Sequence, residues 1–381
     1  MAIDHAKYMS LALRLAAKGR GDVEPNPMVG AVIVKNGRII STGRHKYYGG
    51  PHAEVYALQS AGKAARGATL YVTLEPCVHF GKTPPCVHAV IEAGIREVVI
   101  ATHDPFPKVH GKGIRKLKAA GVKVVEGVLA AEALRLNPGY FKRIMTGMPR
   151  VIAKWAMTLD GKIAAYTGDS RGISSEEALK YAHRLRAQVD GVIVGINTVL
   201  RDDPLLNVRC WQPKGAAPED YQPARIILDS RCRLPLNSRI AETARWADTL
   251  VAVSKSAPVK KIKRLQKLGL EVMPFGSSKD KVDIIALLRY LGREREFTNV
   301  LIEGGAEVLA DAFEKGAVDE VRAIIAPKIL AGKTAVTAVG GAGIAKVADA
   351  LSLTDLKISR LGPDTLITGR IKDEGLRMKK F

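Results

Sequence analysis

The stretch GGPHAEVYAL, residues 49–58, places a histidine and a glutamate two positions apart where a helix is expected to begin. A second stretch, TLEPCVHFGKTPPC at residues 73–86, carries two cysteines that each follow a proline. A catalytic zinc ion takes three protein ligands and leaves its fourth position for water. His52, Cys77 and Cys86 supply such a set, and they predict a catalytic metal site.

The glutamate of this pair fits hydrolytic chemistry. The pattern H-x-E followed by P-C-x-x-C is typical of zinc-dependent nucleobase deaminases, in which the glutamate carries protons and does not bind the metal. Zinc lowers the pKa of a bound water to about 7. We expect Glu54 to take the proton of this water and to pass it to the ring nitrogen and the departing amine. The sequence departs from the pattern in one respect, because eight residues, 78–85, separate the two cysteines.

A structural zinc site, or a chance group of one histidine and two buried cysteines, is the alternative interpretation. A structural site normally closes with a fourth protein ligand, and His79 in the loop between the cysteines is the candidate for it. H-A-E alone is a weak pattern. Combined with P-C and a second cysteine at an expected helix start, it favours the catalytic interpretation.

The composition describes a globular protein with no disulfide framework. A chain of 381 residues, 47% hydrophobic and 25% charged, is long enough for two domains. The net charge of +21 is spread over both halves, as expected for a solubilising surface or for phosphorylated substrates. No apolar run reaches the roughly 20 residues that span a bilayer, and the N-terminus does not resemble a secretion signal. We expect a cytoplasmic homo-oligomer that binds neither membranes nor nucleic acid.

The order of the expected elements predicts two α/β domains. Asn36-Gly37 between two apolar runs predicts a hairpin, and the strands that follow it alternate with helices. A helical stretch over residues 130–147 ends at Gly147, and Pro149 follows it. We therefore predict domains at residues 1–147 and 148–381, each a mixed sheet with helices on both faces.

Several longer motifs resemble one known family. PCVHFGKTPPC at residues 76–86 resembles the longer zinc loop of the riboflavin-biosynthesis deaminases, and PNPMVGAV at residues 25–32 is similar to the N-terminal motif of that family. In the second half, KWAMTLDGK (154–162), VGINTVLRDDPLL (194–206) and LIEGG (301–305) resemble the reductase domain of its bifunctional members. The resemblance covers essentially the whole chain.

The resemblance implies a fold and a pair of activities. It implies a cytidine-deaminase-like α/β/α sandwich followed by an α/β domain similar to dihydrofolate reductase. The first would deaminate a diaminopyrimidinone that carries a ribose phosphate, with Zn²⁺. The second would reduce the ribosyl side chain to ribityl, with NADPH.

The resemblance also implies roles for individual residues. It gives zinc binding to His52, Cys77 and Cys86 and proton transfer to Glu54, and it places Asn26, His45, His79 and Lys82 near the pyrimidine or its ribose phosphate. In the reductase it places Ala156, Thr198, Asp202, Ser230 and Gly305 near NADPH, and Ser170, Arg186, Leu206, Arg209 and Glu303 near the substrate. The guanidinium groups of Arg186 and Arg209 can each form a pair of hydrogen bonds with phosphate oxygens.

One departure from the family and three rival hypotheses accompany this interpretation. Gly172 stands where the family commonly has a tryptophan near the nicotinamide, and it is the support for a monofunctional deaminase with a non-catalytic C-terminal half. A nucleic-acid deaminase would carry P-C-x-x-C and an aromatic binding face, whereas this chain has the longer loop and 5% aromatic residues. A zinc-stabilised binding protein would leave Glu54 unexplained.

Overall fold

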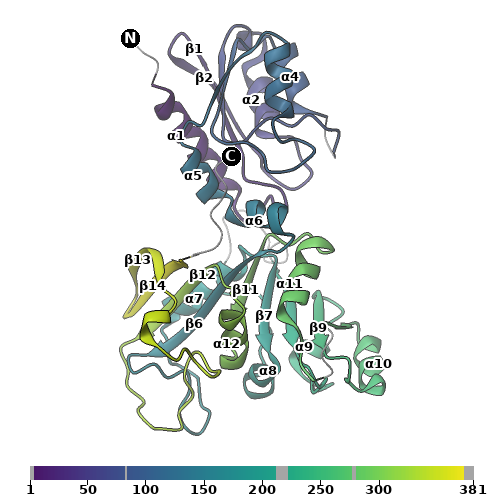
Figure 1. The fold of residues 1–381 in the computed structure, drawn as a ribbon, viewed down its shortest axis with the longest axis vertical. Helices are drawn as coiled ribbons and strands as arrows, with labels where there is room; N and C mark the ends of the chain where they lie inside the picture. The colour runs from purple at the N-terminus through teal and green to yellow at the C-terminus, as the bar shows by residue number, and fades with distance from the viewer. Residues whose placement is uncertain (1–3, 82–83, 212–221, 277–279, 373–381) are drawn as a thin grey trace. The chain divides into compact units, whose positions relative to one another are not determined.

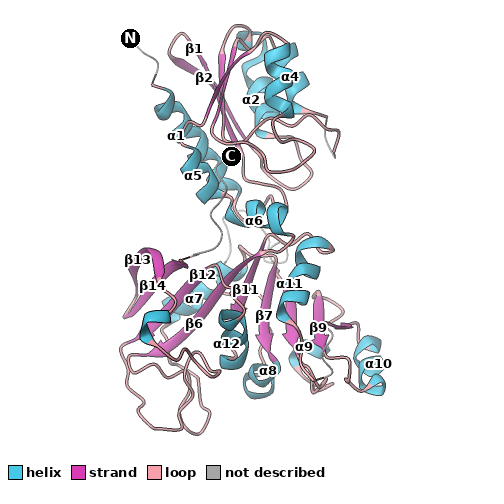
Figure 2. Ribbon diagram, viewed as in Figure 1, coloured by secondary structure: helices cyan, strands magenta, loops and turns pink. Residues whose placement is uncertain are grey.

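The computed structural model describes residues 4–81, 84–211, 222–276 and 280–372 (Figure 1). Two compact units divide the chain, Met1–Met148 and Pro149–Phe381. Both combine strands with helices, as Figure 2 shows. Among the described residues, no helix has both the length and the apolar character that crossing a membrane requires.

The first unit is built on a five-stranded sheet in the order β2-β1-β3-β4-β5. Its strands are β1 (Gly30–Lys35), β2 (Arg38–Arg44), β3 (Thr69–Val72), β4 (Glu97–Ile100) and β5 (Lys123–Glu126). β1 and β2 form the hairpin that the sequence predicts, and Asn36 and Gly37 take the positive φ angles of 50° and 73° that its tight turn requires. β3, β4 and β5 are parallel to one another, so their carboxyl ends share one edge.

Helices cover both faces of this sheet. One face packs against α2 (Ala53–Ala61), α3 (Cys86–Glu92) and α4 (Lys112–Ala119), and the other packs against α1 (His5–Ala16) and α5 (Ala130–Leu136). α2 approaches β2 very closely, because a Cβ added at Gly43 would lie 2.1 Å from the carbonyl oxygen of Ala53. This close approach places the start of α2, and with it His52, beside the sheet.

The single helical stretch predicted over residues 130–147 is wrong, because the structure breaks it into α5 and α6 (Pro138–Thr146). Asn137 lies at the break. Its Oδ1 accepts a hydrogen bond from the backbone N–H of Met28 at 2.8 Å, and its Nδ2 donates to the Met28 carbonyl at 2.9 Å. Proline at the first position of α6 and this pairing favour two helices over one.

The second unit contains a nine-stranded sheet in the order β10-β9-β8-β7-β11-β6-β12-β14-β13. The strands are β6 (Arg150–Thr158), β7 (Gly191–Gly195), β8 (Ala224–Leu228), β9 (Thr249–Val253), β10 (Glu271–Pro274), β11 (Asn299–Glu303), β12 (Glu320–Ala326), β13 (Leu353–Leu361) and β14 (Asp364–Ile371). Neighbours from β10 to β12 are parallel, while β14 and β13 pair antiparallel at one edge. The carboxyl ends of the parallel strands therefore lie along one edge of the sheet.

The helices of this unit connect the parallel strands. They are α7 (Glu176–Arg186), α8 (Ile196–Asp202), α9 (Arg239–Glu242), α10 (Val259–Lys267), α11 (Ile284–Arg293) and α12 (Ala306–Glu314). α8 begins directly after β7, and two residues, Gly304 and Gly305, separate β11 from α12. Short connections of this kind bring helix starts to the carboxyl edge of the sheet, where ligands bind in α/β folds.

Candidate active sites

Three residues that are far apart in the sequence meet in the first unit. His52 precedes α2, Cys77 follows β3, and Cys86 begins α3. The Nδ1 atom of His52 lies 2.8 Å from the Cys86 sulfur and 3.5 Å from the Cys77 sulfur, and the two sulfurs are 3.5 Å apart. One donor atom from each residue thus lies within 4.8 Å of the others.

This donor set fits a catalytic zinc ion. One imidazole nitrogen and two thiolate sulfurs are ligands that zinc prefers, and three of them leave one position open. Within the described part of the chain, the group that could hold a metal contains these three residues and not His79. The ring of His79 instead packs edge-on against Phe106, with 5.5 Å between centroids. The closed structural site considered from the sequence therefore lacks its fourth ligand.

Glu54 lies beside these three residues in the first turn of α2. Its side chain is buried, with 3% of the residue exposed, and burial raises its pKa. Glu54 and the two ligands His52 and Cys77 line the same cavity, whose volume is about 250 Å³. A carboxyl group with a raised pKa in such a cavity is suited to accept and return a proton.

Asn26 and His45 form a second polar wall of this cavity. The Nδ1 atom of His45 lies 3.0 Å from the Pro51 carbonyl oxygen, which can only accept, so the ring carries its proton on Nδ1. Its unprotonated Nε2 then accepts from the Nδ2 of Asn26 at 3.2 Å. Burial lowers the pKa of His45 and keeps the ring neutral. This arrangement leaves the Oδ1 of Asn26 to accept a hydrogen bond from a ligand.

In the second unit, three charged residues meet between β6, β11 and α7. Glu303 accepts from the Nε of Arg186 at 2.7 Å and from the Nζ of Lys154 at 3.3 Å. Lys154 and Glu303 are direct register partners on the neighbouring strands β6 and β11. Burial raises the pKa of Glu303, but Arg186 and Lys154 outweigh it and hold that pKa at about 2. Glu303 is therefore ionised, and both cations are oriented by it.

Other predicted reductase residues lie in smaller groups near the carboxyl ends of the parallel strands. The hydroxyl of Ser170 donates to Asp202 at 3.2 Å. A Cβ added at Gly304 would lie 3.7 Å from the Thr198 hydroxyl, and Gly305, with a φ of 88°, caps the start of α12. Ala156 lies on β6, and Ser230 follows β8, where its Oγ accepts from the N–H of Val282. Lys82 lies outside the described residues.

Comparison with known proteins matches both units to families. Residues 149–367 match the RibD C-terminal domain, and residues 2–102 match the cytidine and deoxycytidylate deaminase zinc-binding region. The chain is 43% identical over 360 residues to the riboflavin biosynthesis protein RibD of Aquifex aeolicus, with 94% of this chain and 96% of the relative covered. This chain belongs to the RibD family.

Solved structures of RibD proteins support the same family assignment. Acinetobacter baumannii RibD is 37% identical, with a TM-score of 0.87 over 97% of this chain and 99% of that one. The diaminohydroxyphosphoribosylaminopyrimidine deaminase/5-amino-6-(5-phosphoribosylamino)uracil reductase of Thermotoga maritima is 36% identical, with a TM-score of 0.80 over 96% of this chain and 98% of that one. Both fold classes expected from the sequence are confirmed, and the chain is a bifunctional riboflavin biosynthesis deaminase and reductase.

The structure adds pocket residues of this RibD chain that the sequence interpretation missed. Asp104, Phe106 and Tyr140 all line the cavity of Glu54. The Oδ1 of Asp104 accepts from the Tyr140 hydroxyl at 2.8 Å and from the Phe106 N–H at 2.9 Å, and burial raises the pKa of Asp104 to about 6. A polar residue just after β4 was the available signal for Asp104. Tyr140 comes from α6 and had no local signal.

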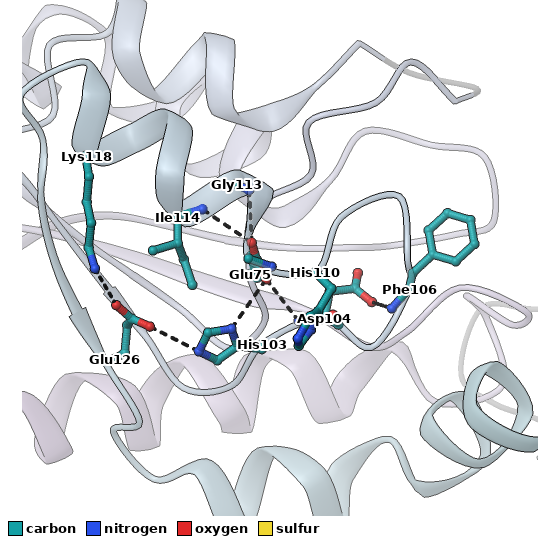
Figure 3. Close-up of polar contacts among 10 residues, drawn as sticks. Glu75, His103, Asp104, Phe106, His110, Gly113, Ile114, Lys118 and Glu126 are labelled. Carbon is teal, nitrogen blue, oxygen red and sulfur yellow. Dashed lines mark hydrogen bonds and ion pairs between the residues drawn. The ribbon is translucent and has the colours of Figure 1, made fainter. Parts of the chain in front are cut away.

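Glu75 is the centre of a further network that the sequence interpretation missed (Figure 3). Its Oε1 accepts from the backbone N–H groups of Gly113 at 2.9 Å and Ile114 at 3.3 Å, while its Oε2 accepts from Gly111 at 2.9 Å and Asp104 at 3.4 Å. Glu75 therefore satisfies the free N–H groups at the start of α4 from a distant part of the sequence. Because Cys77 follows two residues later, the same carboxylate ties this metal ligand to the loop that carries Asp104.

The exposed side of this network is formed by a histidine and a second glutamate. His103 contacts Glu126 at 3.0 Å through Nε2, and Glu126 also accepts from the Nζ of Lys118 at 2.9 Å (Figure 3). These side chains are partly exposed, unlike that of Glu75. Ion pairs in such a position contribute little to stability.

Proposed function

We propose that the first unit deaminates a diaminopyrimidinone that carries a ribosylamino phosphate, and that the second unit reduces the ribosyl group of the product to ribityl with NADPH. The observation that carries the proposal is the buried Glu54 beside His52, Cys77 and Cys86 in one cavity. The name of the Thermotoga maritima relative supports it, because it gives a deaminase and a reductase activity on such compounds to one protein.

In the proposed deamination, His52, Cys77 and Cys86 hold zinc. When bound, zinc acidifies a water molecule, which provides a nucleophile at neutral pH. Glu54 would take one proton from water and deliver it to the ring nitrogen, and it would then carry the second proton, from the hydroxyl group added to the ring, to the departing amino group. The amino group leaves as ammonia, and a carbonyl oxygen from water replaces it.

The remaining cavity residues orient the substrate in this proposal. Asn26 accepts from a pyrimidine N–H through its Oδ1, since its Nδ2 is engaged with His45. His45, His79 and Lys82 would contact the pyrimidine or its ribose phosphate, and of these three Lys82 lies outside the described residues. The neutral form of His45 suits this arrangement, because its unprotonated Nε2 accepts from Asn26 and so fixes the orientation of that amide.

In the proposed reduction, bound NADPH would supply a hydride to the sugar carbon, and a proton from solvent would complete the reduction. Ala156, Thr198, Asp202, Ser230 and Gly305 would hold the cofactor, and the N–H groups at the start of α12 would donate to one of its phosphates. Ser170, Leu206 and Glu303 contact the sugar and the pyrimidine. Arg186 and Arg209 bind the substrate phosphate through their guanidinium groups.

The test follows the two reactions separately in one assay. Purified protein prepared with zinc is given the diaminopyrimidinone ribose phosphate, and ammonia release and NADPH oxidation are both recorded. We expect Glu54→Gln to lower the rate of ammonia release by about 10²- to 10⁴-fold. The same variant should still oxidise NADPH at the normal rate when the deaminated intermediate is supplied directly. Glu92→Gln, an exposed carboxylate on α3, is the matched control and should leave both rates unchanged.

Two results would contradict the proposal. Normal ammonia release by Glu54→Gln would remove this residue from the proton transfer. Ammonia release by the wild-type protein without any NADPH oxidation would remove the reductase assignment. A homo-oligomer remains our proposal for the assembly, and light scattering of the purified protein tests it.

A further inference from the structure

The segment Leu206–Arg209 is held from several sides, and one of its contacts has no role in the reaction described so far. Arg186 donates from Nη1 to the carbonyl oxygen of Asn207 at 3.0 Å, and Arg209 donates from Nη1 to the Oδ1 of Asn207 at 2.8 Å. The backbone N–H of Arg209 donates to the Nδ1 of His183 at 3.2 Å. His183 lies on α7, one turn before Arg186, and is 0% exposed.

The hydrogen bond fixes the protonation of His183. A backbone N–H can only donate, so Nδ1 must be unprotonated and the neutral ring must carry its proton on Nε2. Nε2 is buried and has no hydrogen-bond partner among the described residues. Burying a donor without a partner costs free energy that a leucine at this position would not. The bond at Nδ1 is thus the hydrogen bond that this ring forms with the described residues, and the Asn207 carbonyl also lies close enough to act on the ring.

The charges around His183 also keep it neutral. Burial, Arg186 and Arg209 lower the pKa of His183 to about 4, and they outweigh Glu303 and the Asn207 carbonyl, which act in the opposite direction. A protonated ring would lose its bond to Arg209 and would add a third cation beside the two guanidinium groups. At neutral pH the ring therefore remains a hydrogen-bond acceptor.

The contacts leave guanidinium donors for a ligand. Among the described residues, Arg186 forms its hydrogen bonds through Nε and Nη1, and the side chain of Arg209 forms its bond through Nη1. Both side chains are oriented through Asn207, whose position depends on the backbone of the same segment. A shift of the Arg209 backbone would move both guanidinium groups relative to each other.

We propose that His183 is a positioning residue of the reductase site. Its neutral Nδ1 anchors the Arg209 backbone, so that Arg186 and Arg209 converge on the phosphate of the substrate. This inference rests on the proposed function, in which these two arginines bind that phosphate. His183 itself does not touch the substrate.

Three substitutions test the acceptor. His183→Leu removes it, His183→Asn keeps an acceptor at the same branch position through Oδ1, and His183→Gln moves the acceptor one bond further out. Steady-state reductase kinetics are measured on the deaminated ribosylamino phosphate and on its dephosphorylated form. The thermal midpoint reports whether the second unit of each variant is folded, and ammonia release by the first unit controls for the amount of active enzyme.

We expect the Leu and Gln variants to raise KM for the phosphorylated substrate by about tenfold or more, which corresponds to about 1.4 kcal/mol. We expect kcat to stay within about threefold, because a positioning contact acts on substrate binding. KM for the dephosphorylated form should not change. The Asn variant should return KM to within about threefold of the wild-type value.

The outcomes separate this inference from the proposed function. A wild-type KM in both the Leu and Gln variants, an equal rise for both substrate forms, or an Asn variant as impaired as Gln would overturn the role of His183. If the Leu variant does not fold, the comparison of Asn with Gln decides. A wild-type enzyme that binds both forms equally well would instead overturn the phosphate contact itself, and the role of His183 with it.

Discussion

Replacing Glu75 by glutamine tests whether one carboxylate holds the active-site loop to the sheet. In the wild type, two carboxylate oxygens accept four backbone N–H groups, one short and one long bond at each oxygen. In Glu75→Gln one oxygen becomes an NH₂ group, so one such pair of N–H groups faces a donor. The substitution hardly changes the volume of the side chain and therefore isolates the loss of acceptors.

The expected magnitude follows from these contacts. A buried N–H group that loses its partner costs about 1–3 kcal/mol, and the longer bond of each pair contributes least. The lost charge at the start of α4 adds roughly 0.3–1 kcal/mol. We expect the free energy of unfolding of the first unit to fall by about 2–4 kcal/mol, a large part of the roughly 5–15 kcal/mol that stabilises a domain.

Urea unfolding of the full chain, followed by a probe in the first unit, measures this change. With a dependence on urea of about 2 kcal/mol per molar, the middle of the usual range, the midpoint should fall by about 1–2 M. Glu126→Gln is the control, since it removes a partly exposed carboxylate of the same network and should cost at most about 1 kcal/mol. A loss in Glu75→Gln no larger than in Glu126→Gln would refute the reasoning.

Three further predictions concern stability. The folded-state pKa of Asp104 is raised from 3.8 to about 6, so its ionisation makes the folded state progressively less stable as pH rises through that window. Asp104→Asn should therefore raise the free energy of unfolding at pH 8 by roughly 1–3 kcal/mol. An equal gain at pH 3.5 would contradict this cause. Arg225 is 2% exposed and donates to the hydroxyls of Thr249 and Thr243. Arg225→Lys should therefore lower the free energy of unfolding in urea by about 2–4 kcal/mol. A loss under 0.5 kcal/mol, roughly that of a neutral surface change, would be inconsistent with these bonds. Gly172 has a φ of 71° and open space around an added Cβ. Gly172→Ala should therefore lower the free energy of unfolding by about 1 kcal/mol through the backbone alone. An unchanged thermal midpoint would argue against that strain.

Local chemistry made much of the first unit predictable. The turn at Asn36-Gly37, the helix that begins after His52 and the alternation of strands and helices after it all depend on neighbouring residues. The metal group could be proposed because its residue types and order are distinctive. The longer loop between the cysteines did not hide it, since Cys86 still begins a helix beside Cys77.

The features that the sequence did not predict depend on distant contacts. The break at Asn137 is stabilised by Met28, and Glu75 finds its partners at the start of α4. In the second unit the short helices α8, α9 and α10 and the strands β10 and β13 were not expected. β13 is exposed along nearly its whole length, so it lacks the alternation of buried and exposed residues that marks a strand.

The pairing of Asn137 with Met28 limits how far this enzyme can be shortened. A fragment that ended after β5 would keep every strand of the first sheet and all three metal-binding side chains. It would nevertheless lose Tyr140 and Ile144 from the wall of the cavity, and the backbone of Met28 would lose its amide partner. An excised deaminase should therefore run through the end of α6 at Thr146, well beyond the residue 102 at which the deaminase family match stops.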